Sequence, residues 1–203
     1  MKTSRLLLIF SLLATTITVF SCKNNNSVKV SDKDSTKVDT LWNEKVQNEF
    51  FDTPFGASKK EVIKNFAKHG FTYNKVLSSE QRLVFDHQGS RYYNFGGMSW
   101  ELLNVYINDG KFSAISFYTP IKDKAEAISN YEGIADVLSK KYYLTSIEPN
   151  DSTVYGVQCA LSKSNIIAQV SCYRYESIGK EIFYTAELSY ADTNIENEIS
   201  EEL

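Results

Sequence analysis

Two cysteines, Cys159 and Cys172, carry the most reactive side chains of the second half of the chain. In an oxidising compartment two such cysteines can form a disulfide. If residues 162–165 form a hairpin turn, Cys159 pairs with Ala168, and both thiols share one apolar face, four residues out of register. That offset is about 13 Å, which exceeds the Cα separation that a disulfide spans. The spacing therefore favours two buried free thiols over a Cys159–Cys172 disulfide, and a catalytic thiol is the least favoured alternative.

The two histidines, His69 and His87, do not form a metal-ligand pattern. His69 falls at the end of a predicted helix, where a cation complements the helix dipole, and His87 ends a predicted strand. The chain contains neither CxxC nor HExxH, and it lacks the GxSxG, phosphate-loop and dinucleotide motifs. Gly96-Gly97 indicates a turn or bulge. The sequence therefore predicts no metal site, no cofactor and no catalytic residue, and it favours a protein that is not an enzyme.

One aromatic segment is a candidate protein-binding surface. It contains two glycines and the side-chain types that recur at interface hot spots; its candidate residues are Arg91, Tyr92, Tyr93, Phe95 and Trp100. A second cluster, Tyr173-Arg174-Tyr175, falls on a predicted strand, where residues 173 and 175 share one face. The alternative, which the composition favours, is that these rings fill the core and edges of a tyrosine-rich sheet.

Two helices are predicted to position these groups. Ser58 and Glu61 form an S-x-x-E capping box, and Gly70 ends the first helix. Its apolar face consists of Val62, Ile63, Phe66 and Ala67. A second helix begins near Asp123, and its apolar residues recur at steps of three and four: Ile128, Tyr131, Ala135, Leu138 and Tyr142.

Three strands are predicted after each helix. After the first helix they cover 81–86, 100–107 and 111–118, and Asn108-Asp109-Gly110 indicates a hairpin between the last two. After the second helix they cover 154–161, 166–175 and 182–190. The sequence therefore predicts an α+β fold in which two helix-plus-three-strand repeats, at about 50–118 and 119–192, form an antiparallel sheet.

The amino terminus resembles the signal of bacterial lipoproteins. Lys2 and Arg5 precede an apolar stretch, and the small residue Ser21 stands directly before Cys22, as in a lipobox. The stretch is shorter than the roughly 20 apolar residues of a spanning helix. In that family the signal is removed, and the cysteine carries a diacylglyceryl group and usually an acyl chain such as palmitate. The resemblance implies that Cys22 is the lipid attachment residue; an ordinary secretory signal is the alternative.

Composition divides the remainder of the chain. Residues 1–21 are expected to be the signal peptide and 22–48 a flexible polar tether; 49–192 form the domain and 193–203 an acidic tail. The chain has 13 Tyr and 12 Phe, which favours a sheet-rich fold. Its net charge is −3, and it has no run of basic residues, which argues against a nucleic-acid partner.

The helix start Gly56-Ala57-Ser58-Lys59-Lys60-Glu61-Val62 and the turn Asn108-Asp109-Gly110-Lys111-Phe112 carry a second resemblance. Over about residues 50–190 the chain is similar to the beta-lactamase-inhibitory-protein-like fold and to small outer-membrane-assembly lipoproteins. The inhibitory proteins have two modules in tandem and bind partner proteins on a concave sheet. This chain differs in having one predicted helix per repeat where that family usually has two.

Together these features favour a lipid-anchored cell-envelope protein that acts as a protein-binding or scaffolding module. We expect it at the outer membrane, facing the periplasm. The membrane contact is expected to be made through the lipid, with an envelope protein as the partner. The alternative is a small-ligand carrier or an enzyme whose site is assembled across the sheet.

Overall fold

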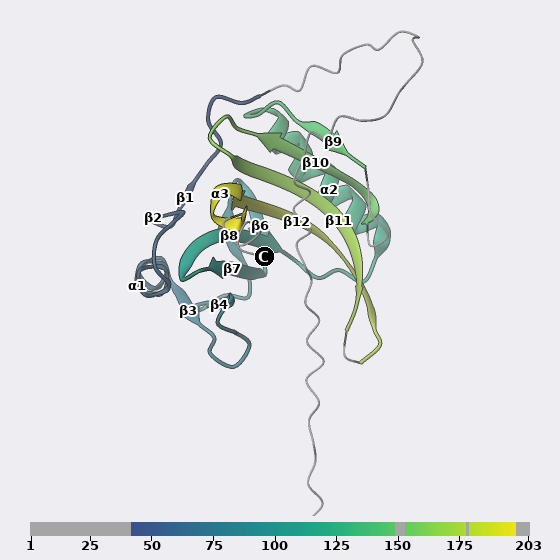
Figure 1. The fold of residues 1–203 in the computed structure, drawn as a ribbon. Helices are drawn as coiled ribbons and strands as arrows, with labels where there is room; N and C mark the ends of the chain where they lie inside the picture. Colours follow the sequence, from purple (N-terminus) through teal and green to yellow (C-terminus); the bar gives the residue numbers. More distant parts are fainter. Residues whose placement is uncertain (1–41, 149–152, 178, 198–203) are drawn as a thin grey trace, which may run out of the picture. The chain divides into compact units, whose positions relative to one another are not determined.

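An eight-stranded antiparallel sheet dominates the computed structural model, which describes residues 42–148, 153–177 and 179–197 (Figure 1). All of these residues belong to the unit Lys37–Leu203. From edge to edge the strands are β3 (Phe71–Tyr73), β4 (Arg82–His87), β7 (Leu102–Asn108), β8 (Lys111–Tyr118), β12 (Ile182–Asp192), β11 (Ile166–Glu176), β10 (Thr153–Leu161) and β9 (Thr145–Ile147). The last strands of the two halves of the chain, β8 and β12, therefore meet at the centre.

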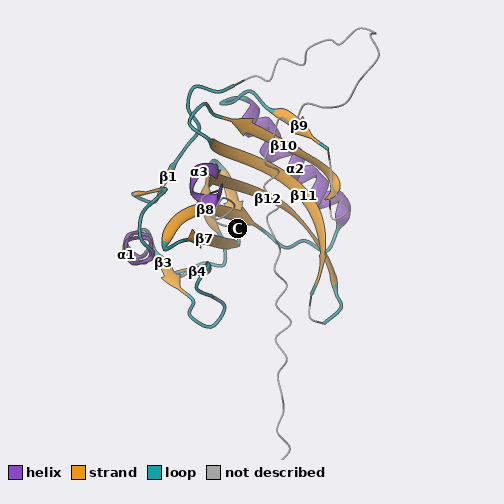
Figure 2. Cartoon of the chain, viewed as in Figure 1, coloured by secondary structure: helices purple, strands orange, loops and turns teal. Residues whose placement is uncertain are grey.

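Short elements complete the fold (Figure 2). They are the hairpin strands β1 (Glu49–Phe50) with β2 (Thr53–Pro54) and β5 (Tyr93–Phe95) with β6 (Met98–Trp100), and the helices α1 (Lys59–Lys68), α2 (Lys124–Ser139) and α3 (Thr193–Asn197). The α+β class with an antiparallel sheet is confirmed. None of the helices in the described ranges is long and apolar enough to cross a membrane.

The predicted helix signals are confirmed. Ser58 caps α1: its Oγ accepts from the N–H of Glu61 at 3.3 Å, and the Glu61 carboxylate accepts from the N–H of Ser58 at 2.9 Å. Val62 and Phe66 are buried, whereas Ala67, predicted on the same face, is exposed. Asp123 caps α2 by accepting from the N–H of Glu126 at 2.9 Å.

One face of the sheet is apolar and carries the core. Along β12, Ala186, Leu188 and Tyr190 alternate with polar residues, and they lie in register with Cys172, Val170 and Ala168 of β11. Helix α2 packs on this face of β11 and β12. Over the other half, α1 and the hairpin β5–β6 cover the same face, where the ring of Phe95 stacks on that of Phe117 at 4.1 Å.

The opposite face, here called the polar face, consists of the alternate residues of the same strands. At its centre are Asn104 and Tyr106 of β7, Ser116 and Tyr118 of β8, Thr185, Glu187 and Ser189 of β12, and Ser171 and Tyr173 of β11. Helix α3 lies at one end of this face, where Asn108 Nδ2 donates to the carbonyl oxygen of Ile195 at 2.7 Å. Figure 1 shows α3 in front of the sheet and α2 behind it.

The structure differs from the predicted element boundaries in several places. Each helix precedes four strands of the sheet, whereas three were predicted. The additional strands, β3 and β9, lie at the edges, and their three residues are too few to show an alternating pattern in the sequence. The predicted strand 100–107 breaks at Glu101, whose N–H donates to Thr119 Oγ1 at 3.1 Å. Residues 42–48, predicted as tether, lie against the domain, since Asn43 and Val46 are buried. Residues 193–197 of the predicted tail form α3.

The predicted pairing of β10 with β11 is wrong by one residue. Cys159 pairs with Gln169, not with Ala168, because the connection places Asn165 at a positive φ of 62° and Ser162 Oγ accepts from the N–H of Ile166 at 3.0 Å. A shift of one residue moves side chains to the other face of a sheet. Cys159 therefore lies on the polar face and Cys172 on the apolar face. Both are buried, and neither forms a disulfide.

Replacement of Phe50 by alanine should lower the free energy of unfolding by about 3–5 kcal/mol, because the cavity it leaves is lined by aromatic rings. The ring is 1 % exposed and contacts five others, including Tyr190 at 4.9 Å and Phe55 at 5.5 Å between centroids. Urea denaturation of Phe50→Ala measures this change. The control Val76→Ala, at a side chain that is 88 % exposed, should change stability by less than about 0.5 kcal/mol. A loss below about 1 kcal/mol in Phe50→Ala would contradict this packing.

The two thiols should not form a disulfide with each other even under oxidising conditions, because they project from opposite faces of the sheet. In a Cys22→Ala form, a thiol reagent should find no rapidly reacting group in the folded protein and two thiols after denaturation. Burial raises the pKa of the Cys172 thiol, which further slows its reaction in the folded state. A denatured, unreduced sample without free thiols would show that a disulfide forms after all.

Candidate functional site

The aromatic segment proposed from the sequence forms the hairpin β5–β6. Tyr93 and Trp100 are buried, and their polar atoms donate to backbone carbonyl oxygens, Tyr93 Oη to Leu102 at 2.9 Å and Trp100 Nε1 to Phe95 at 3.0 Å. Phe95 is half-buried on the core. These three rings therefore contribute to packing on the apolar face.

The remaining two candidates of that segment lie on the surface. Arg91 pairs with Glu101, with 2.9 Å between Nη2 and Oε1, and its guanidinium carbon lies 5.6 Å from the ring centroid of Tyr92. The ring of Tyr92 is 46 % exposed. A binding surface at this hairpin remains a prediction, and of its five candidate residues these two are exposed.

The two histidines lie in separate surroundings. His69 is the C-cap of α1, and its Nε2 lies 2.8 Å from Asp52 Oδ2. His87 ends β4, where its ring packs against those of Phe71 and Tyr93. Within the described ranges, no three His, Cys, Asp or Glu side chains come together in a group that could hold a metal ion. Cys22 lies outside the described residues.

An open groove of about 560 Å³ lies between α2 and the edge strands β9 and β10. Tyr131 forms its floor beneath Gly156, where an added Cβ would lie 3.0 Å from the tyrosine hydroxyl. On its rim, Tyr155 Oη donates to Glu132 Oε1 at 2.7 Å. The lining also includes the polar residues Ser146, Glu148 and Gln158, so the groove offers a bound molecule polar as well as apolar contacts.

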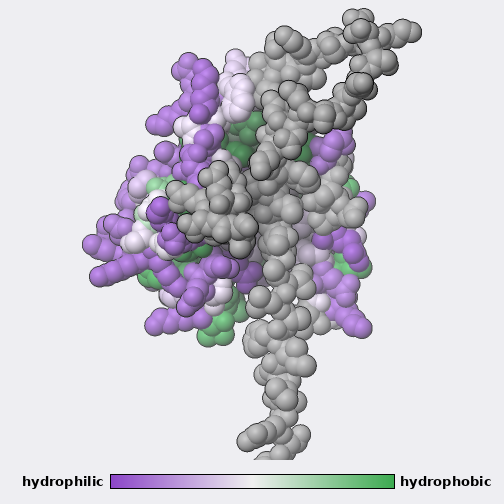
Figure 3. All heavy atoms as spheres, in the orientation of Figure 1, coloured by the Kyte–Doolittle hydropathy of each residue, from purple (hydrophilic) through white to green (hydrophobic). Residues whose placement is uncertain are grey.

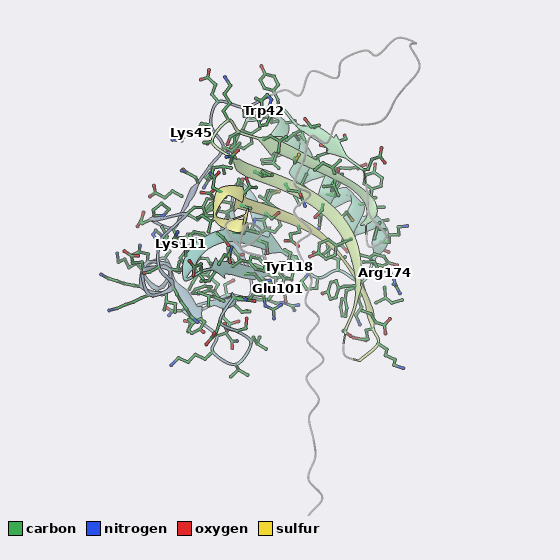
Figure 4. The ribbon with its side chains drawn as sticks, viewed as in Figure 1. Trp42, Lys45, Glu101, Lys111, Tyr118 and Arg174 are labelled. Atoms are coloured by element: carbon green, nitrogen blue, oxygen red, sulfur yellow. The ribbon has the colours of Figure 1, made fainter. Side chains whose placement is uncertain are left out.

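The centre of the polar face brings together a carboxyl group, three phenols, an amide and a hydroxyl. We call it the Glu187 cluster, and it consists of Asn104, Tyr106, Ser116, Tyr118, Tyr173 and Glu187. Four adjacent strands supply it, β7, β8, β12 and β11. In register, Glu187 lies between Tyr118 on one side and Ser171 on the other. Figure 4 shows Tyr118 near Glu101 and well away from Arg174.

Hydrogen bonds connect part of the Glu187 cluster. Tyr173 Oη donates to Glu187 Oε2, and Asn104 Nδ2 donates to Tyr118 Oη at 3.1 Å. Ser116 adjoins both Glu187 and Tyr106, yet its Oγ is fully buried and has no hydrogen-bond partner of regular geometry among the described residues. Buried hydroxyls normally form well-aligned hydrogen bonds, so the contacts of Ser116 with Glu187 and Tyr106 depart from the usual geometry.

Burial sets the electrostatics of the Glu187 cluster. It raises the pKa of Glu187, against the opposing effect of the neighbouring Tyr173 and Ser116 hydroxyls. Burial and the nearby Glu187 carboxyl raise the pKa of Tyr106 to about 12 and also raise that of Tyr173. Burial raises the pKa of Tyr118, while the bond from Asn104 and the charge of Arg82 oppose it. The phenols therefore remain protonated donors at neutral pH.

The charge of Glu187 is not matched by a basic partner. No Lys, Arg or His side chain that the structure describes forms an ion pair with it. The described surface in Figure 3 is mainly hydrophilic, with smaller hydrophobic areas between. The Glu187 cluster can thus act as a receptor that offers one carboxyl oxygen, phenol hydroxyls and aromatic edges and faces to a bound group.

The amino-acid sequence alone does not single out this site. It names only Tyr173 and Tyr175, as two aromatic residues on one face of a strand, and the structure places both on the polar face. Burial and the neighbouring Tyr118 and Glu101 raise the pKa of Tyr175 to about 12, which shows that it extends the same surface. The missed signal is Glu187, the one charged residue within 182–190, which stands between the apolar residues Ala186 and Leu188.

Comparison with protein-family models, with curated proteins and with solved structures found no match. What this domain does must therefore be inferred from its own side chains. The Glu187 cluster is the arrangement on which that inference rests, since it combines a carboxyl of raised pKa with a buried hydroxyl that forms no regular hydrogen bond among the described residues.

The variant Glu187→Gln should gain stability relative to the wild type as the pH rises. Because the pKa of Glu187 is higher in the folded than in the unfolded state, the folded state binds more protons between the unfolded pKa, about 4.3, and the raised one. Wild-type stability therefore falls across that window and stays reduced above it. Chemical denaturation at several pH values measures the effect.

A control of opposite sign is Glu61, whose pKa is lowered by its hydrogen bonds to Ser58. Glu61→Gln should be less stable than the wild type at neutral pH, and this difference should shrink at acid pH, where Glu61 of the wild type is protonated. Parallel stability–pH curves for the wild type and Glu187→Gln would contradict the raised pKa of Glu187.

Proposed function

We propose that this chain is a lipid-anchored cell-envelope protein that binds another protein through the polar face of its sheet. The observation that carries this proposal is the Glu187 cluster, in which tyrosines surround a carboxyl without an ionic partner. Tyrosine is enriched at the energetic centres of protein interfaces, because one end of its ring is apolar and the other forms hydrogen bonds.

The anchor in this proposal is Cys22, by the resemblance of residues 2–22 to a lipoprotein signal. Two or more acyl chains give the stable attachment that a single chain does not. The domain would then face the periplasm from the outer membrane, and the residues between Cys22 and the domain would serve as its tether. Mass spectrometry of the purified protein tests the acylation directly.

We also propose that the domain arose from two repeats, at about 50–118 and 119–192. Helix α1 precedes β3, β4, β7 and β8, and α2 precedes β9, β10, β11 and β12. In each half the strands follow one another in chain order from an edge of the sheet to its centre. The order of the first four strands is therefore mirrored by that of the last four, on the two sides of the β8–β12 pair. This arrangement supports the similarity to the beta-lactamase-inhibitory-protein-like fold, whose tandem modules bind proteins with the sheet.

A small-ligand carrier is the second candidate function. The groove between α2 and β9–β10, at about 560 Å³, falls within the size range of ligand pockets. Its wide opening and its paired Tyr155 and Glu132 make it the weaker candidate. Ligand screening against Gly156→Leu, which would fill the groove, separates this function from protein binding.

Crosslinking in cells followed by affinity purification of the tagged full-length protein tests the protein-binding function. We expect one envelope protein to be recovered with the wild type. At least roughly tenfold less should be recovered with Tyr118→Ala/Tyr175→Ala, because these rings form much of the polar face. Cys22→Ala should also reduce recovery, since it removes the anchor.

Two controls decide where the partner binds. Tyr143→Ala removes an exposed ring that lies outside the polar face and should leave recovery unchanged. Arg91→Ala/Tyr92→Ala removes the two exposed candidate side chains that directly precede β5. Loss of the partner in this variant alone would place the interface beside the β5–β6 hairpin. Circular dichroism confirms that each variant is folded. Full recovery with a folded Tyr118→Ala/Tyr175→Ala protein would contradict binding through the polar face.

A further inference from the structure

The Glu187 carboxyl lies at the centre of the sheet without a positive charge to balance it. It projects from β12, the strand of the second half of the chain that lies at the centre of the sheet, and its in-register neighbours are Tyr118 and Ser171. Arg82 projects from the same face, but from β4, which β7 and β8 separate from β12. A carboxylate that is withdrawn from water and lacks a cation is unfavourable, and a cation brought by a bound molecule removes this penalty.

The phenols around Glu187 suit a cation as well. Tyr106, Tyr118 and Tyr173 come from three strands on the same face. Tyrosine rings attract ammonium and guanidinium groups electrostatically through their faces. Since all three phenols remain protonated at neutral pH, the carboxyl of Glu187 is the group of the cluster with which a bound cation would pair, and such a cation would favour its ionised form.

Ser116 supplies an independent observation. Its side chain is 0 % exposed, it adjoins Glu187, and its Oγ has no hydrogen-bond partner of regular geometry among the described residues. A bound group that donates an N–H to Oγ would satisfy this atom. Ser171 and Ser189 lie beside Glu187 with short side chains, while Tyr118 and Tyr173 are its large neighbours. An anionic group would instead meet the carboxylate at close range.

We propose that the Glu187 cluster receives the protonated side chain of a lysine or arginine that a partner protein inserts into the polar face. This inference rests on the protein-binding function proposed above and specifies its partner. The charge balance of the chain, with 25 acidic and 22 basic residues, favours a basic partner surface. A single side chain also matches a receptor centred on one carboxyl and one hydroxyl.

Peptide binding to the mature, acylated full-length protein in detergent micelles tests the proposal. The probes are the capped tripeptides Gly-Lys-Gly and Gly-Arg-Gly, the neutral isostere Gly-norleucine-Gly, and free 1,4-diaminobutane. NMR titration should show that a lysine or arginine peptide shifts the signals of Ser116 and Glu187. The norleucine peptide should bind at least roughly tenfold more weakly, because it lacks the charge.

The matched variants are Glu187→Gln and Glu132→Gln. Both remove the carboxylate of a tyrosine–glutamate hydrogen bond, but Glu132 pairs with Tyr155 at the groove. Glu187→Gln should weaken peptide binding at least roughly tenfold, and Glu132→Gln should leave it unchanged. Equal binding of the norleucine peptide, no shift with either basic peptide, or unchanged affinity in Glu187→Gln would each overturn the proposal. Tighter binding of 1,4-diaminobutane than of either peptide would overturn it in favour of a free amine.

The crosslinking experiment separates failure of this inference from failure of the proposed function. A partner recovered equally well with the wild type and with Glu187→Gln would overturn the insertion of a cation and leave protein binding intact. Absence of any partner with the wild type would contradict the protein-binding function, whereas the peptide titration would still decide whether the Glu187 cluster binds cations.

Discussion

The antiparallel pairing of β8 with β12 makes one sheet out of strands from the two halves of the chain. Five residue pairs form this contact, from Glu187 opposite Tyr118 to Ala191 opposite Ala114. The pairing continues the apolar face across the joint, because Leu188 lies opposite Phe117 and Tyr190 opposite Ile115. By the same alternation it assembles the polar face, since residues that flank those pairs project to the other side.

The polar face represents a compromise between stability and binding. Thr185 and Asn104 are buried there and form hydrogen bonds, as buried polar groups normally do. Glu187 and Ser116 depart from that rule, because among the described residues the carboxyl has no ionic partner and the hydroxyl lacks a regular hydrogen bond. Departures of this kind are expected at binding sites, where the missing partner belongs to another molecule.

Local signals in the sequence predicted much of the fold. The capping box at Ser58, the cap at Asp123 and the hairpin at Asp109-Gly110, where both residues have positive φ, were each confirmed, because neighbouring residues alone determine them. The strand that ends at Tyr118 was predicted with its observed bounds. The register of β10 with β11 was not, because a single residue in the connection at Asn165 reverses which face Cys159 occupies.

The Glu187 cluster could not be predicted in the same way. The alternation of side chains along residues 182–190 places Glu187 on the opposite face of the strand from Ala186 and Leu188. The neighbouring residues in the sequence do not show that Tyr118 and Tyr173 flank it. Those neighbours depend on pairing between strands that are distant in the chain. Conversely, the hairpin residues Tyr93 and Trp100 have interface-like side chains, and only the tertiary packing shows that they fill the core.

The central claim is that the polar face is the surface that meets a partner. Photocrosslinking in cells from the position of Tyr118, replaced by p-benzoylphenylalanine, tests it most directly, with the same replacement at the exposed Tyr143 for comparison. The account predicts a covalent adduct with one envelope protein from position 118 and none from position 143. An adduct that forms equally from both positions, or from position 143 alone, would contradict it.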